Sequence, residues 1–220
     1  YRACLGFAAA AQRRGALLFE RSTVTRVRFD RKRLDVVADG GMIHAGTVVV
    51  ATGTATSEFR PLRRHFKRRE LYHVLTAPIA APVRKQLGPR DTVLRDARTP
   101  PHNLRWASDE RLIVAGADQD ETPMKQRTGV LIQRTGQLMY ELLTMYPAIS
   151  GLQAEYGWEM PYGQTADGLM YIGPHRNYPR HLFALGSTGS VTGSFLSARI
   201  LLRALQGRPE KADQAFGWAR

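Results

Sequence analysis

Three glycines near the C-terminus lie between a short apolar strand and an amphipathic helix. The strand is predicted over 181–185, Gly186, Gly189 and Gly193 occupy the next eight residues, and the helix ends at Gly207. A glycine turn at a helix N-terminus presents unpaired backbone N–H groups, and the helix dipole adds partial positive charge there. The pattern therefore indicates a site for an anionic group. A turn that only caps the helix is the alternative.

A second strand that ends in a small-residue turn is predicted over 47–53. Its sequence, TVVVATG, is an apolar run of β-branched residues. Buried parallel strands have this composition, because both faces of their sheet are covered. Open α/β folds bind ligands at the carboxyl edge of such strands, so this turn is also a candidate for ligand binding.

The remaining elements indicate a mixed fold of the α/β class, α+β overall. A helix over 3–14, a strand over 16–20 and an antiparallel meander over 24–45 come first. A long helix follows Pro123 and stops at Pro147. Strands separated by proline and charged turns predict an antiparallel sheet before that helix. These strands are 71–79, 92–96, 103–107 and 111–117, and the apolar stripe of the long helix is Val130, Leu131, Leu138, Leu142 and Met145.

Size and composition limit the class of protein. The 220 residues, 43% of them hydrophobic, suffice for one large domain or two small ones. No apolar run approaches the roughly 18 residues of a membrane span, so none is expected. The only cysteine, Cys4, excludes an internal disulfide and is typical of a reducing compartment. We therefore expect a cytoplasmic location.

The formal charge of +13 raises the possibility of a nucleic-acid partner. Most of the 32 basic residues are arginines scattered along the chain, which favours a biased genome composition. The one cluster, RPLRRHFKRR at 60–69, is either a polyanion-binding patch or a solvated helix face. Because no aromatic residue other than Phe66 interleaves with it, we favour the solvated face and do not expect nucleic acid as a partner.

Four motifs, in this order, make the chain resemble the FAD-dependent oxidoreductases of the D-amino acid oxidase and glycine oxidase type. They are Ser-Thr-Val at 22–24, VVVATG at 48–53, TADGLMYIG at 165–173 and FALGSTGSVTG at 183–193. The resemblance extends over the whole chain. It implies part of an FAD-binding, Rossmann-like domain over 1–66 and 161–220, and an antiparallel substrate domain with the long helix over 67–160.

The resemblance also bears on the first residue, Tyr1. Proteins of this family begin with a strand, a GxGxxG turn and a helix that hold the FAD pyrophosphate. The sequence contains no such βαβ element. We interpret the chain as the C-terminal half of a longer flavoprotein, inactive by itself. A degenerate fragment that binds no cofactor is a further alternative.

In this family the turn before the last helix faces the flavin ring, where backbone donors stabilise the negative charge of the reduced ring. The resemblance therefore implies FAD as the cofactor. Two departures from the family pattern are Val191, which narrows the approach to the ring, and Met170, which replaces a proline. The cofactor-binding candidates are Val24, Thr52, Gly53, Gly186, Ser187, Thr188, Gly189, Ser190, Val191 and Thr192.

A third departure concerns the substrate. Amino-acid oxidases of this type often carry a carboxylate-binding arginine five residues before the position of Asp167, where this chain has Tyr162. Tyrosine lacks the guanidinium fork of a bidentate clamp. We expect hydride transfer to flavin from the C–N bond of an amine or amino-acid-like compound, with oxygen or another acceptor reoxidising the flavin. No catalytic side chain and no metal site is predicted. The substrate-binding candidates are Tyr162, His102, Arg105 and Trp158.

Overall fold

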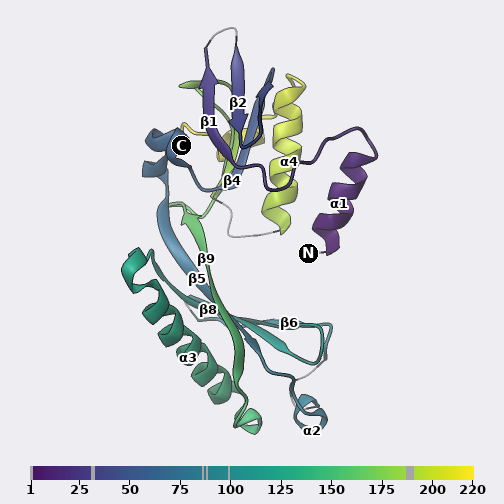
Figure 1. Ribbon diagram of the computed structural model, residues 1–220, viewed down its shortest axis with the longest axis vertical. Helices are drawn as coiled ribbons and strands as arrows, with labels where there is room; N and C mark the ends of the chain where they lie inside the picture. Colours follow the sequence, from purple (N-terminus) through teal and green to yellow (C-terminus); the bar gives the residue numbers. More distant parts are fainter. Residues whose placement is uncertain (1, 31–32, 86, 88, 99, 187–190) are drawn as a thin grey trace.

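The chain forms two lobes, and two long strands of the lower lobe reach up to the upper one (Figure 1). This computed structural model describes residues 2–30, 33–85, 87, 89–98, 100–186 and 191–220. The helices are α1 (Arg2–Gln12), α2 (Ala81–Arg84), α3 (Arg127–Met145) and α4 (Val191–Leu205), with 3₁₀ helices at Ser57–His65, Met124–Gln126, Pro147–Ile149 and Lys211–Phe216. The strands are β1 (Val24–Phe29), β2 (Leu34–Ala38), β3 (Gly41–His44), β4 (Val48–Gly53), β5 (Lys67–Thr76), β6 (Val93–Arg95), β7 (Asn103–Trp106), β8 (Leu112–Asp120), β9 (Ala154–Gln164), β10 (Tyr171–His175) and β11 (Tyr178–Leu185).

The upper lobe of Figure 1 is built on a sheet in the order β10–β11–β4. β11 runs parallel to β4 and antiparallel to β10. On one face Phe183 and Leu185 pack with Phe59 of the Ser57–His65 helix, and on the other Leu182 packs with Ile200 of α4. Apolar packing on both faces fixes the carboxyl end of β11 beside the start of α4.

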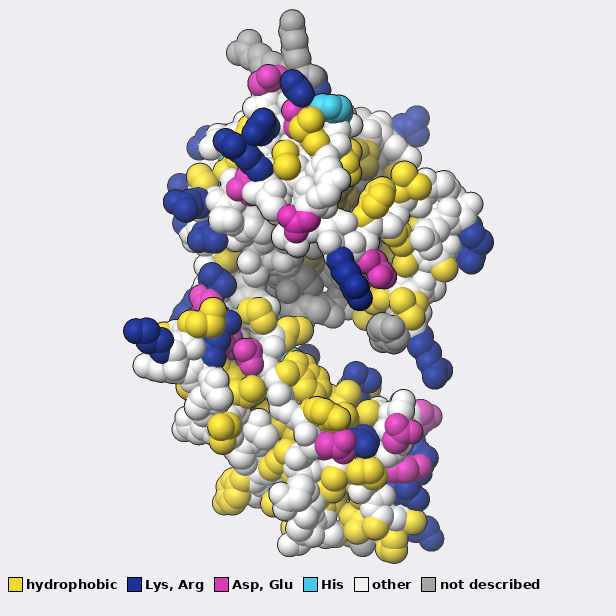
Figure 2. Space-filling model, in the orientation of Figure 1, with side chains coloured by type: hydrophobic (Ala, Val, Ile, Leu, Met, Phe, Trp, Pro, Cys, Tyr) yellow, Lys and Arg dark blue, Asp and Glu magenta, His cyan; other side chains and the backbone are white. Residues whose placement is uncertain are grey.

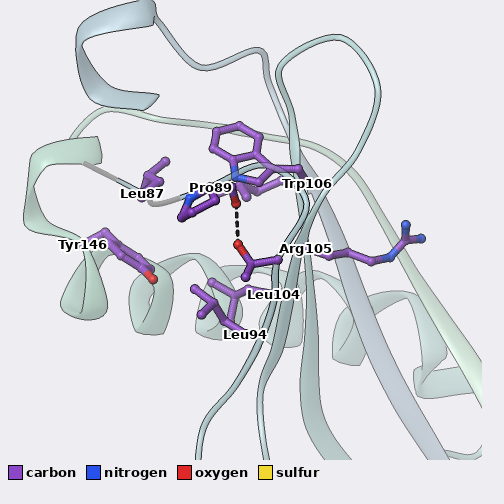
Figure 3. A pocket seen from close by; sticks show the side chains of 9 residues that line it. Leu87, Pro89, Leu94, Leu104, Arg105, Trp106 and Tyr146 are labelled. Atoms are coloured by element: carbon purple, nitrogen blue, oxygen red, sulfur yellow. Dashed lines mark hydrogen bonds between the residues drawn. The ribbon is translucent and has the colours of Figure 1, made fainter. Parts of the chain in front are cut away.

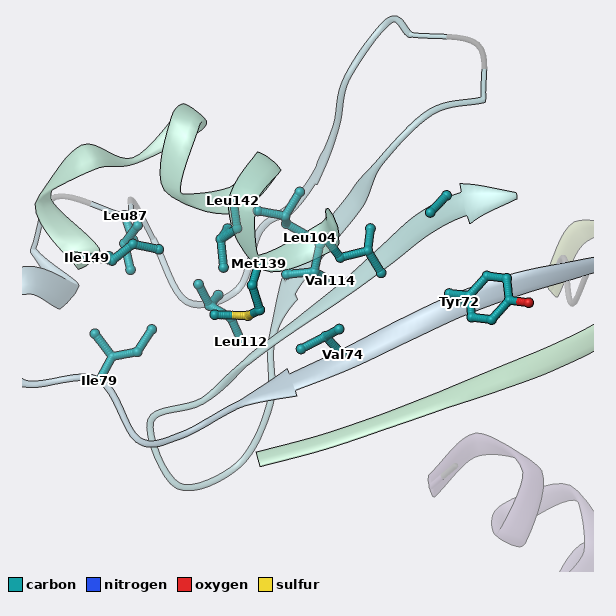
Figure 4. Close-up of a cluster of buried hydrophobic side chains, with 12 residues drawn as sticks. Tyr72, Val74, Ile79, Leu87, Leu104, Leu112, Val114, Met139, Leu142 and Ile149 are labelled. Carbon is teal, nitrogen blue, oxygen red and sulfur yellow. The ribbon is translucent and has the colours of Figure 1, made fainter. Parts of the chain in front are cut away.

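The lower lobe is a five-stranded antiparallel sheet in the order β6–β7–β8–β5–β9. Side chains alternate between the two faces of a strand, and those of Tyr72 and Val74 point to the face that α3 covers. There they belong to one buried cluster with Leu138 and Leu142 of the helix. Figure 4 shows this cluster between the sheet and the helix. The opposite face of this sheet carries no helix in Figure 1, and below we call it the open face.

Several predicted elements are confirmed. The meander predicted over 24–45 is the antiparallel sheet β1–β2–β3, whose last strand ends at His44. The N-terminal helix is α1, and Gly15 beyond it has a φ of +90°, a conformation that favours glycine. The long helix and the antiparallel middle sheet are also observed, so the fold is the mixed α/β architecture expected from the sequence.

Two predictions are wrong in detail. Residues 16–20 form no strand; Leu17 and Phe19 are 79% and 67% exposed, because no neighbouring strand pairs with this segment. The strand predicted at 47–53 does run parallel to its partner, but only one of its two faces is covered. Val49 is 45% exposed, and β11 is the one strand that pairs with β4 in the described part of the chain.

The arginine cluster at 60–69 is not one helix face. The 3₁₀ helix ends at His65, and β5 begins at Lys67. Within this cluster Lys67 and Arg69 pair with Asp120, and Arg68 pairs with Glu121. These internal ion pairs neutralise part of the cluster, which weakens it as a polyanion-binding patch.

Candidate active site

The two glycine turns singled out in the sequence meet in the fold. The backbone N–H of Gly186 donates a hydrogen bond to the carbonyl of Gly53 at 2.8 Å, which joins the carboxyl ends of β11 and β4. Both glycines have positive φ, +87° and +75°. A Cβ at Gly186 would lie 2.8 Å from the methyl carbon of Thr165, whereas a Cβ at Gly53 would face open space. The Gly53 side of this junction is therefore free to receive a ligand.

A pocket of about 470 Å³ opens beside this junction. Its walls come from the ends of β4 and β11, from β9 and from the first half of α4. Small residues dominate the lining, so a flat group can approach the backbone closely. The lining residues are Ala51, Gly53, Met160, Pro161, Tyr162, Met170, Ala184, Ser194, Ser197, Ala198 and Leu201.

The residues present suit the flavin part of FAD. The pocket lies at the carboxyl edge of a parallel strand pair, where open α/β sheets bind cofactors. The Thr165 hydroxyl beside Gly186 is buried and has no hydrogen-bond partner among the described residues. Buried polar atoms are rarely left without a partner, so this hydroxyl is available to a bound polar group.

Tyr162 lies at the boundary between this pocket and the open face. The phenol is 9% exposed and donates a hydrogen bond of 2.6 Å to Oδ2 of Asp118. Burial, together with the neighbouring Asp118 carboxylate, raises the pKa of Tyr162 to about 12. The hydroxyl therefore stays protonated near neutral pH and remains a donor. Arg69 lies directly opposite Tyr162 in the β5–β9 ladder and pairs with Asp120 at 3.1 Å.

A stacked pair of rings continues the open face below Tyr162. His73 and Trp158 are directly opposite in the same ladder, and their ring centroids are 5.1 Å apart with an interplanar angle of 7°. Burial lowers the pKa of His73, and the charge of Arg105 lowers it further, while the charge of Asp118 acts in the opposite direction. His73 is therefore neutral near pH 7. The stack offers an apolar aromatic surface to a substrate.

The predicted substrate residues do not all come together. Residues directly opposite each other in neighbouring strands point to the same face of a sheet. Arg105 pairs with Ile113, Ile113 with Leu75, and Leu75 with Tyr156. Tyr156, Trp158 and Tyr162 alternate along β9, so all of them share the open face with Arg105. Arg105 nevertheless lies three strands from β9, about 14 Å at the usual spacing. Figure 3 shows its side chain extending away from the small apolar cluster around Leu104 and Trp106. Arg105 is thus too far away to act on a small molecule held at Tyr162.

His102 lies on the wrong face of the sheet for this role. It is buried on the α3 side, where Nδ1 lies 2.7 Å from Asp96 and Nε2 lies 2.6 Å from Glu141 of α3. Two carboxylates hold the ring between the strand end and the helix. Both ring nitrogens of His102 are thus engaged in joining α3 to the sheet, on the face opposite Tyr162.

The cofactor candidates also separate into groups. Thr52, Gly53 and Gly186 meet at the junction, and α4 begins at Val191, which is 84% exposed and is followed by exposed Thr192. Val24 lies on β1 in the separate β1–β2–β3 sheet and is 50% exposed, so the fold leaves it outside the junction. The other four candidates, Ser187, Thr188, Gly189 and Ser190, lie outside the described residues.

Sequence reasoning missed three polar residues of the open face: Asp118, Arg69 and His73. Their common signal is strand alternation, because every second residue of β5 shares a face with Tyr162 and Trp158. Asp118 is harder to find. It follows Ala117, whose φ is +53°, and the β5–β8 register shifts next to it. Such an irregularity changes which side chains face the site.

The family model described as FAD dependent oxidoreductase matches residues 1–204. No curated protein sequence gives a significant match. Among solved structures, glycine oxidase from Geobacillus kaustophilus superimposes with a TM-score of 0.70 at 19% identity, over 97% of this chain and 56% of that one. L-proline dehydrogenase from P. horikoshii gives 0.72 at 18% identity, over 98% and 57%. Iminodiacetate oxidase from Chelativorans sp. BNC1 gives 0.70 at 13% identity, over 95% and 55%.

The fold is the one that these solved oxidase and dehydrogenase structures share. The chain belongs to the FAD-dependent oxidoreductase family, as the order of its motifs predicted. It spans little more than half the length of the solved structures that it matches. Figure 2 shows an indentation between the two lobes, with hydrophobic side chains gathered on the lower lobe below it. None of the helices in the described ranges is long and apolar enough to cross a membrane.

Proposed function

We propose that the protein oxidises the C–N bond of an amine or an amino-acid-like compound, with FAD bound at the 470 Å³ pocket. The observation that carries this proposal is the hydrogen bond from Tyr162 to Asp118 on the open face. A carboxylate at this position attracts a substrate ammonium group and repels a substrate carboxylate. The aromatic ring of Tyr162 adds a surface suited to a cation or an apolar group.

FAD bound in this pocket would supply the acceptor for a hydride from the carbon next to the substrate nitrogen; the ammonium group first releases a proton to solvent, and the oxidised substrate leaves as an iminium ion. The chain's own residues bind and orient the substrate. Asp118 holds the nitrogen end, Tyr162 keeps that carboxylate in place through its O–H, and the His73–Trp158 stack supports the apolar part. The lining from α4 and β9 excludes water from one side of the pocket, which strengthens these electrostatic contacts.

Residues 1–66 and 161–220 serve the cofactor in this proposal, and residues 67–160 serve the substrate. Within the cofactor part, the Gly53–Gly186 junction and the start of α4 present backbone close to the ring. We place the protein in the cytoplasm, with oxygen or a separate electron acceptor as the second substrate.

The test is a substrate panel with the full-length flavoprotein that contains this chain, loaded with FAD. Primary and N-substituted amines should reduce the bound flavin anaerobically faster than glycine, sarcosine or D-alanine does. Tyr162→Arg should shift preference toward the carboxylates by about tenfold or more, because it supplies a charge-assisted contact of about 1.5–3 kcal/mol. Efficient reduction by glycine or D-alanine in the wild type would overturn the proposal. Loss of that activity in Arg69→Gln would then assign the clamp to Arg69, the guanidinium opposite Tyr162.

A further inference from the structure

A second pocket, of about 450 Å³, lies in the upper lobe beside β10 and the C-terminal residues. It is distinct from the candidate active site. Its His175 pairs with Tyr178 at the hairpin end of β10, whereas the Gly53–Gly186 junction lies at the opposite end of β11. We call it the basic pocket, and its lining residues are Arg64, His65, Pro174, His175, Arg176, Trp218 and Ala219.

The charge of the basic pocket is unbalanced. Its lining includes two arginines and two histidines but no aspartate or glutamate. Among the described residues, neither Arg64 nor Arg176 forms an ion pair with a carboxylate, while many other arginines of the chain do. Surface arginines brought together without a counter-charge repel one another, and a bound anion removes this cost.

The two histidines of the pocket supply hydrogen-bond donors beside the charged arginines. Burial lowers the pKa of His65, and the charges of Arg64 and Arg220 lower it further. Burial also lowers the pKa of His175, as do the charges of His65, Arg176 and Arg64. Near neutral pH the fixed charge of the pocket is therefore that of its two arginines. The neutral imidazoles can still each donate one hydrogen bond.

Aromatic rings form the inner wall. Trp218 packs edge-on against His65 and His175, with centroid separations of 5.4 and 5.2 Å, and stacks on Tyr171 at 4.6 Å. The indole N–H of Trp218 is buried without a hydrogen-bond partner among the described residues. A pocket of this volume is in the range that holds small organic molecules, and it is far larger than a single oxyanion requires.

We propose that the basic pocket binds a small planar molecule that carries one phosphate group. Arg64 and Arg176 contact the phosphate, whose charge of about −1.5 to −2 at neutral pH matches two guanidinium groups. The ring of the ligand lies against the aromatic wall beside Trp218. The same chemistry is shared by aryl phosphates and by nucleoside monophosphates, and it requires no part of the FAD pocket.

Calorimetric titration of the 220-residue chain tests this with three probes: phenyl phosphate, phenol and inorganic phosphate. Phenyl phosphate should bind at least about tenfold more tightly than either of the others. AMP, titrated in the same way, shows whether a nucleoside can replace the phenyl ring. Weaker binding of phenyl phosphate than of inorganic phosphate would contradict the proposed contact between the ligand's ring and the aromatic wall.

Variants locate the binding. The double variant Arg64→Ala/Arg176→Ala should weaken phenyl phosphate binding by about tenfold or more. The matched control Arg60→Ala/Arg63→Ala removes two exposed arginines from the same segment, outside the pocket lining, and should change it by less than about twofold. Equal losses in both would show that the charge of the whole surface, and not this pocket, attracts the anion.

Trp218 also packs against the core, so its replacement alone would not separate binding from folding. Ala219→Trp fills the pocket from an exposed position instead. It should abolish phenyl phosphate binding while the circular dichroism spectrum and the urea unfolding curve stay unchanged. Retained binding in this variant would contradict the proposed location.

Discussion

Glu70 is a buried carboxylate that connects β5 to the segment before α3. It is 1% exposed and accepts hydrogen bonds from the hydroxyls of Thr122, at 2.7 Å, and Tyr72, at 2.8 Å. Burial acts to raise the pKa of Glu70, but these hydrogen bonds and the charge of Arg127 outweigh it and lower the pKa. The charged form is thus better stabilised in the folded state than in the unfolded chain.

Because of Glu70, the free energy of unfolding should depend on pH in the acid range. A lowered folded-state pKa contributes stability that is present above the unfolded pKa, about 4.3, and is lost as the pH falls through the folded value. Glu70→Gln should lower stability at pH 7 by about 1.5–3 kcal/mol and flatten this acid-dependent loss. Urea unfolding between neutral and acid pH measures both effects. Glu20→Gln, which alters an exposed glutamate, should change neither.

Asp118 gives a second prediction at the scale of single residues. Asp118→Asn keeps an oxygen to accept the Tyr162 hydroxyl but removes the negative charge. If this carboxylate holds the substrate ammonium, KM for amines should rise about tenfold to a hundredfold, with less effect on a neutral analogue. Steady-state kinetics on the FAD-loaded protein measure the change, with exposed Asp91→Asn as the control. An unchanged KM would assign amine binding to other residues.

These residues differ in how far the sequence predicts them. Tyr162 can be identified from the sequence because the family motif has an arginine at this position, and the change to tyrosine indicates a different substrate. Arg69 and His73 depend on which strand pairs with β9, and Asp118 depends on an irregularity in β8. His102 shows the limit of the resemblance. The family resemblance made it a substrate-binding candidate, but the alternation of the strand turns its ring to the α3 face.

At the scale of elements, the junction between β4 and β11 depends on two glycines with positive φ. Gly186→Ala should destabilise the fold more than Gly53→Ala does. Both add strain of about 1–3 kcal/mol, but only the Cβ at Gly186 also meets the methyl carbon of Thr165 at 2.8 Å and a ring carbon of Phe66 at 3.2 Å. Chemical unfolding of the two variants measures the difference, with Gly207→Ala, which faces open space, as a second control. Equal losses would mean that Thr165 and Phe66 move aside easily.

The sequence predicts most elements correctly, because long apolar periods and proline or glycine stops are local features. The α3 stripe and the β1–β2–β3 meander are examples. It fails at residues 16–20 and at Val49, because burial there depends on which chain segments lie alongside. An apolar run of five residues carries no information about its neighbours.

At the scale of the whole molecule, cofactor affinity should depend on more than the site described here. The sequence contains no GxGxxG turn, the element that supplies backbone donors to a dinucleotide pyrophosphate. We therefore expect the 220-residue chain alone to bind FAD with a Kd above about 0.1 mM, equivalent to less than about 5.5 kcal/mol. Quenching of flavin fluorescence measures this affinity. Tight, stoichiometric binding would show that the Gly53–Gly186 junction and α4 suffice.

The two long strands that connect the lobes, β5 and β9, also determine how the molecule can deform. β5 and β9 pair from Lys67 opposite Gln164 to Thr76 opposite Ala154, a ribbon about 33 Å long at the usual rise per residue. A two-stranded ribbon with continuous hydrogen bonds can twist but cannot bend sharply like a hinge. It is therefore a rigid connection between the lobes. The spacing between the 470 Å³ pocket and the open face is thereby held constant. In the proposed reaction, the exchange of substrate and product would then depend on the movement of surface loops.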